Sequence, residues 1–97
     1  MKLTRKEFKA GDKIVALPEA VFIYKLPDCV LEVEHQLVGV VEVFDNGMSN
    51  LRTCDTYAHI FKVRKGNFTN KKSFAIDSKY FRLATESDIS EYLLEEL

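Results

Sequence analysis

Apolar and polar residues alternate with a period of two along much of this 97-residue chain. This pattern is typical of β-strands that bury one face. The turn pair Gly11-Asp12 precedes an apolar run, so we expect a first strand to begin near Lys13 and stop at Pro18. The branched and aromatic residues of 20–26 have strand propensity and predict a second strand directly afterwards.

The centre of the chain predicts a hairpin that turns at residues 45–47, whose sequence Asp-Asn-Gly favours a tight connection between strands. A two-residue loop would mix polar and apolar side chains on one face of this hairpin. A three-residue loop instead pairs Val43 with Ser49 and keeps the apolar residues together. In that register Phe44 stands opposite Met48 on the outer face of the hairpin.

Two further segments predict which face of each strand is buried. In segment 30–35, Leu31 and Val33 share a face opposite two glutamates. In segment 57–64, one face carries four large side chains and is expected to face the core: Tyr57, His59, Phe61 and Val63. Segments 73–76 and 80–84 complete a set of six or seven short strands.

This arrangement predicts a mainly β fold in one domain, residues 1–97. Short strands at close spacing, with no helical segment between them, favour a small antiparallel β-barrel of about six strands over residues 11–84. A barrel avoids long unpaired strand edges, which otherwise promote aggregation.

The last segment, 85–97, predicts a short C-terminal α-helix. Thr85 can act as the N-cap, with Asp88 three residues later as in a capping box. The apolar stripe of this helix is narrow and consists of Ile89, Tyr92, Leu93 and Leu97. A helix of this length is marginally stable alone, so we expect it to dock on an open end or flank of the barrel.

Both ends of the chain resemble a known group of proteins. The opening Gly11-Asp12-Lys13-Ile14-Val15 and the ending 81–86, with short strands between them, resemble small accessory proteins of tailed bacteriophages. Many of those look like Src-homology-3-like barrels with a short terminal helix. The resemblance implies that fold, a phage origin and a place in the host cytoplasm. Segments 11–15 and 37–43 also look faintly like the small barrels of ribosomal and transcription-elongation proteins.

Composition places the chain among ordinary globular domains, with 46% apolar and 30% charged residues. No apolar run reaches the roughly 18–20 residues that a membrane-spanning helix needs. We therefore expect a cytoplasmic protein whose two cysteines, Cys29 and Cys54, stay reduced and act as small buried apolar side chains.

Charge is distributed in blocks, although the formal net charge is only −1. Residues 26–50 carry five acids and no base, whereas residues 51–84 carry eight bases and two acids. The closing helix is acidic again. A chain that binds nucleic acid over its whole surface is usually strongly basic, so this alternation favours a charged protein partner.

The sequence contains no convincing catalytic or metal-binding set. Cys29 with His35, and Cys54 with His59, supply zinc-ligand types but lack the close spacing of zinc knuckles. A Cys54 nucleophile activated by His59 needs a bend in the strand, with Asp55 as the orienting group. The four glycines are far apart and form no phosphate-binding loop. We therefore expect a non-enzymatic protein without cofactor or metal.

The leading hypothesis is a protein that binds and modulates or inhibits a host or phage protein, in host takeover or counter-defence. Its predicted contact anchors are Phe44 and Met48 at the hairpin tip. A charged rim surrounds them, formed by Glu42, Asp45 and Arg52. The competing interpretation is that barrel closure or the terminal helix buries both anchors. The acidic helix face at Glu91 and Glu95 is the next candidate surface.

The alternative hypothesis is a nucleic-acid-binding barrel that uses a basic hairpin at 62–72. Five side chains there can contact phosphates while the aromatic ring of Phe68 stacks on a base. The five are Lys62, Arg64, Lys65, Lys71 and Lys72. The same charges also suit a solvated hairpin that promotes solubility.

Overall fold

The computed structural model describes residues 4–44, 51–63 and 73–95. Within them the order of elements is β1 (Lys13–Ala16), α1 (Pro18–Tyr24), β2 (Cys29–Phe44), β3 (Leu51–Val63), β4 (Ser73–Ile76), the 3-10 turn η1 (Ser78–Tyr80), β5 (Phe81–Leu83) and α2 (Glu86–Glu95). In this part of the chain, no helix is long and apolar enough to cross a lipid bilayer.

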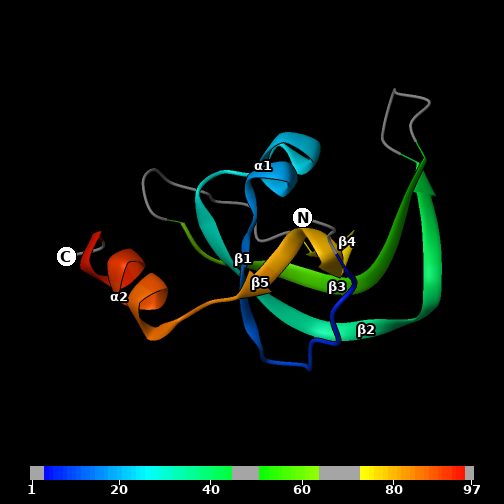
Figure 1. Ribbon diagram of the computed structural model, residues 1–97. Helices are drawn as coiled ribbons and strands as arrows, with labels where there is room; N and C mark the ends of the chain where they lie inside the picture. The colour runs from blue at the N-terminus through cyan, green and yellow to red at the C-terminus, as the bar shows by residue number, and fades with distance from the viewer. Residues whose placement is uncertain (1–3, 45–50, 64–72, 96–97) are drawn as a thin grey trace.

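The described strands form one antiparallel sheet in the order β4-β3-β2-β1-β5 (Figure 1). This confirms the mainly β prediction. The sheet has five strands rather than six or seven, because residues predicted as four short strands join into two long ones, β2 and β3. Strands β4 and β5 are the edges of the described sheet and do not pair with each other, so closure into a barrel is not confirmed.

The main core lies on one face of the sheet. It contains Ile14, Leu31, Val33, Ala58, Ile60, Ile76 and Phe81. The prediction for Leu31 and Val33 is confirmed. The predicted core face of β3 is wrong over most of the strand: Ala58 and Ile60 are buried, whereas His59 points to the opposite face. Val63, near the end of the strand, does pack against the main core, as predicted.

His59 occupies that opposite face because two carboxylates stand beside it on β2. Its Nε2 lies 3.3 Å from Glu32 Oε1, and its Nδ1 lies 3.1 Å from Glu34 Oε1. Glu32 also accepts from Lys13 Nζ at 2.7 Å, and this bond lowers the pKa of the Glu32 carboxyl. The His59 ring is stable on this partly exposed face because it contacts two carboxylates. Its aromatic character alone therefore gave the wrong prediction of a core position.

The segment predicted as a second strand, 20–26, is largely helical, and this prediction is wrong. Pro18 begins α1 with a fixed φ that suits a first helical turn, and Lys25 ends it in the left-handed region at φ 53°. Ala20 and Tyr24 share the inward helix face, four residues apart; Ala20 is fully buried and the Tyr24 ring lies 5.8 Å from that of Phe81. Tertiary packing therefore overrides strand propensity here.

The predicted C-terminal helix is confirmed as α2, together with its capping box. Asp88 N donates to Thr85 Oγ1 at 3.2 Å, and Thr85 N donates to Asp88 Oδ2 at 2.8 Å. The helix contacts β2, and Ala84, just before it, packs against buried Val30. The helix therefore docks on the flank of the sheet.

Both cysteines are buried and neither forms a disulfide, as predicted. Burial, with a smaller contribution from Asp28, raises the pKa of the Cys29 thiol to about 12. A thiol in this state is a poor nucleophile and a poor metal ligand.

Candidate binding surface

Strand β2 bends sharply in its second half. Gln36 pairs with Thr56 and Val41 pairs with Cys54, so the residues 37–40 of β2 stand opposite Asp55 alone. Gly39 lies within this bulge at φ +68°, a conformation that glycine adopts far more readily than other residues. We call residues 36–41 the β2 bend.

The β2 bend exposes apolar side chains to solvent. Val38 is fully exposed (102%), Val40 is 53% exposed and Val41 is 38% exposed. Single exposed apolar residues are common on protein surfaces, but three within four positions of the β2 bend form a local patch. None of these three side chains belongs to the main core that Leu31 and Val33 fill earlier in the same strand.

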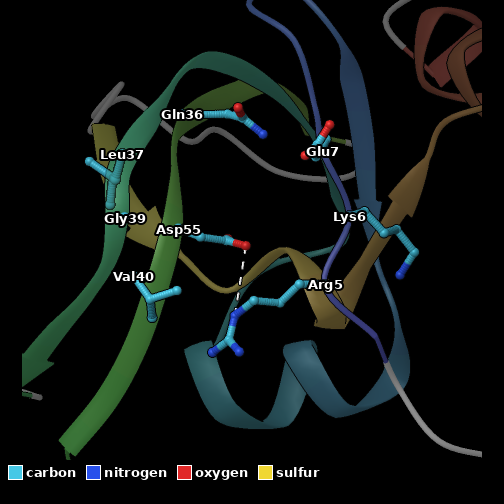
Figure 2. Close-up of a pocket in the computed structure, with 8 residues that line it drawn as sticks. All are labelled: Arg5, Lys6, Glu7, Gln36, Leu37, Gly39, Val40 and Asp55. Carbon is cyan, nitrogen blue, oxygen red and sulfur yellow. Dashed lines mark ion pairs between the residues drawn. The ribbon is translucent and has the colours of Figure 1, made fainter.

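A pocket of about 300 Å³ lies beneath the bend (Figure 2). One wall is formed by the bend itself, through Gln36, Leu37, Gly39 and Val40. The N-terminal residues 5–7 form the facing wall, and Asp55 of β3 completes the lining. The pocket therefore combines apolar side chains with charged side chains of both signs.

Arg5 connects this pocket to a buried acid. Its guanidinium NH2 lies 3.1 Å from Asp77 Oδ2 and its Nε lies 3.8 Å from Asp55 Oδ2. Figure 2 shows the Arg5 side chain reaching from the N-terminal segment towards Asp55. The Asp77 side chain is only 3% exposed, and Lys79 N also donates to it at 3.2 Å. A carboxylate buried to this extent needs such partners.

Ser78 holds the other end of the same network. Its Oγ donates to Asp55 Oδ2 at 2.7 Å and its backbone N donates to Asp55 Oδ1 at 2.9 Å. Lys6 N in turn donates to Ser78 Oγ at 2.8 Å. Asp77 N donates to the hydroxyl of Tyr24, at 2.9 Å. The network thus joins the N-terminal segment, α1, β3 and η1, and it fixes the wall of the pocket.

Among the described residues, three exposed large apolar side chains lie outside the bend: Val21, Phe22 and Leu83. Phe22 on α1 is 85% exposed beside Val21, and Leu83 on the edge strand β5 is 56% exposed. None of the three lines the pocket. They provide control positions for testing whether an exposed apolar side chain binds a partner only when it lies in the bend.

The predicted hairpin register is wrong. Phe44 pairs with Leu51 rather than standing opposite Met48, and Val43 pairs with Arg52 rather than with Ser49. The bulge at 37–40 shifts the pairing of every residue after it, and strict alternation cannot foresee such a shift.

The predicted contact residues are only partly described. Glu42 is exposed and pairs with Thr53. Asp45 and Met48 lie outside the described residues, as do the side chains of Phe44 and Arg52. The hairpin-tip surface therefore stays a prediction.

The basic hairpin is represented by one residue. Lys62 is half-buried near the end of β3, where it pairs with Val30. The other residues of this set lie outside the described part of the chain: Arg64, Lys65, Phe68, Lys71 and Lys72. The nucleic-acid hypothesis stays a prediction.

The Cys54–His59 pair is separated by the sheet. Cys54 is buried on the core face with Thr56 and Ala58, whereas His59 lies on the opposite face beside Glu32. His35 lies against Tyr57, with ring centroids 5.2 Å apart. Within the described ranges, no group of three or more His, Cys, Asp or Glu side chains is placed to hold a metal ion.

The β2 bend and the Arg5 network were both missed at the sequence level. Gly39 inside an apolar run was the available signal for a bulge, because glycine weakens a regular strand. No local signal links Arg5 to Asp77, since 72 residues separate them.

The chain was compared with known protein families, curated proteins and solved structures. The chain matches no protein-family model, no curated protein and no solved structure.

Proposed function

We propose that this chain is a small, non-enzymatic binding protein that attaches to another protein through the β2 bend. The exposure of Val38 carries the proposal, because a bulge that turns an apolar side chain fully into solvent offers no gain to the fold. Val40 and Val41 enlarge the patch, and the adjoining pocket supplies polar groups around it. An apolar centre with a polar rim is the usual composition of a protein interface.

The arrangement of the strands supports a Src-homology-3-like barrel as the finer description of the fold. The order β4-β3-β2-β1-β5, two long curved central strands and a 3-10 turn before the last strand are consistent with that class. The proposed relation to accessory proteins of tailed bacteriophages depends on this description of the fold. On this proposal the partner is a host or phage protein, which the chain modulates or inhibits in the host cytoplasm.

Capture from a bacterial lysate tests the function directly. The tagged full-length chain is compared with Val38→Asp and with the matched control Leu83→Asp, each with and without nuclease treatment. Both changes place a carboxylate at an exposed apolar site, so both variants should keep their thermal stability. We expect one protein to be retained after nuclease treatment by the wild type and by Leu83→Asp, and to be lost from Val38→Asp.

Other outcomes assign the function elsewhere. Loss of all captured material after nuclease treatment would favour the nucleic-acid hypothesis built on the 62–72 hairpin. Equal capture by all three proteins would show that the bend is not the contact surface, and Phe22 would then be the next position to change.

A further inference from the structure

The N-terminal residues 4–7, which we call the N-terminal strap, lie across one wall of the pocket beneath the β2 bend. Among the described residues, positions 4–8 make no backbone-to-backbone hydrogen bond. The strap is attached through the Arg5 side chain and through Lys6 N, which donates to Ser78 Oγ at 2.8 Å. Segments with so few backbone bonds open at a lower free energy than the core does.

The strap has a fixed end at Phe8. This side chain is 3% exposed and belongs to the main core with Ile14 and Leu31. Beyond it, Gly11 N donates to Val33 O at 2.7 Å, which ties the following turn to β2. Any movement of the strap must therefore stop at Phe8, because displacing that ring would open the core.

Arg5 is the strongest attachment of the strap. Its guanidinium bonds Asp77 Oδ2 at 3.1 Å and Thr53 Oγ1 at 2.7 Å, and its Nε lies 3.8 Å from Asp55 Oδ2. The Arg5 side chain is itself 40% exposed, so water can replace these contacts when the strap leaves. The two carboxylates would keep Ser78 and Lys79 as hydrogen-bond donors.

We propose that the N-terminal strap opens and closes over the pocket as a unit separate from the core, with Arg5 as its latch. Closure supplies one wall of the pocket, through Lys6 and Glu7, and neutralises the facing carboxylates. Opening removes that wall, leaves Asp55 facing the bend and withdraws the Arg5 guanidinium from buried Asp77. The regulatory meaning of this movement rests on the proposed function, because the strap forms the pocket wall that faces the β2 bend.

Amide hydrogen exchange, followed residue by residue in the full-length chain, tests the proposal without any partner. The Lys6 amide reports on the strap, and the Val33 amide, which donates to Asp12 O at 2.9 Å, reports on the core. In the wild type the Lys6 amide should be protected at least about tenfold less than the Val33 amide. Arg5→Ala should lower Lys6 protection by about a further tenfold, since a hydrogen bond to a charged group contributes about that factor.

The controls separate a latch from a general loss of stability. Val33 protection should change by less than about twofold in Arg5→Ala, because local opening leaves the core intact. Arg5→Lys keeps the charge but not the fork of donors, so its Lys6 protection should fall between the other two. Arg82→Ala removes a matched arginine–aspartate pair, Arg82–Asp88 at 2.8 Å, and should change neither amide.

Equal protection of Lys6 and Val33 in the wild type, falling together in Arg5→Lys, would overturn the proposal. It would show that the strap opens only when the whole domain unfolds. The wild type and Arg5→Lys decide the matter even if Arg5→Ala fails to fold. Because the experiment contains no partner, its failure would leave the capture experiment and the proposed function untouched.

Discussion

The two halves of the β2–β3 hairpin both contain valines, but the burial of these side chains differs between the halves. In the basal half, Leu31 pairs with Ile60 and Val33 pairs with Ala58, and all four side chains are buried. In the distal half, after Gln36, Val38, Val40 and Val41 of β2 are exposed. Figure 1 shows the far ends of β2 and β3 curving away from the rest of the sheet.

Neighbouring elements explain the difference. The basal half of β2 has β1 on its other side, paired through Glu32, and α1 and Phe81 supply apolar side chains above it. Within the described strands, the distal half of β2 pairs with β3 alone. A two-stranded ribbon is marginally stable by itself and cannot bury its own apolar face. Valine is therefore a core residue in one half and a solvent-exposed residue in the other.

The largest test of this contrast compares one truncation in each half. Leu31→Ala should lower the free energy of unfolding by about 2–5 kcal/mol, because it leaves a cavity in the core. Val40→Ala should lower it by less than about 0.5 kcal/mol, because the side chain is 53% exposed. Urea denaturation followed by circular dichroism measures both. A cost at Val40 close to that at Leu31 would mean that the distal half is packed.

Removal of α2 tests how much this helix stabilises the basal half of the hairpin. A chain that ends after Ala84 loses the helix that contacts β2, including half-buried Ile89. Burial of one large apolar side chain contributes about 1.5–3 kcal/mol, and we expect a loss of that order. Thermal unfolding measures it. An unchanged melting temperature would show that α2 adds nothing to the basal half.

The junction between the two halves depends on Asp77. Asp77→Ala removes the buried acceptor that Arg5, Thr53 and Lys79 share, and should cost about 2 kcal/mol because those donors lose their bond. Asp88→Ala breaks an exposed pair with Arg82 and the capping-box bond from Thr85 N, and should cost less, about 1 kcal/mol. Denaturation of the two variants in parallel gives the comparison. Equal costs would contradict a structural role for the Arg5 network.

The smallest effect concerns acid. A hydrogen bond from Arg82, with a further one from Thr85 N, holds the pKa of the Asp88 carboxyl well below its usual value. A carboxyl with a lowered folded-state pKa stabilises the fold above its unfolded pKa of about 3.9, and this stability is lost as pH falls towards the folded value. Below about pH 4 the wild type should therefore lose more stability than Asp88→Asn. Melting temperatures of the two proteins, measured from pH 6 to pH 3, test this. Equal decreases in both proteins would contradict the assignment.

Local signals in the sequence predicted local structure well. The Thr85–Asp88 capping box and the alternation at Leu31 and Val33 depend on residues only two or three positions apart, and both are confirmed. α1 was missed because its inward face needs Phe81, which comes from the far end of the chain. The hairpin register was missed because the bulge at 37–40 breaks the period of two.

The candidate surface was the least predictable part. Arg5 and Asp77 meet only after the sheet has formed, and nothing in their local sequence anticipates the pair. The exposure of Val38 is equally hard to predict from the sequence, because Val33, earlier in the same strand, is a core residue. Sequence pattern gives the periodicity of burial, whereas the neighbouring elements decide where burial ends.

Site-specific photo-crosslinking tests the central claim, that the β2 bend contacts a protein, most directly. A photoreactive phenylalanine analogue replaces Val38, Phe22 or Leu83 in turn, all three of which are exposed. After irradiation in cells and nuclease treatment, a discrete protein adduct is expected from position 38, and none from position 83. Adducts from position 22 alone, or equal adducts from all three positions, would contradict the claim.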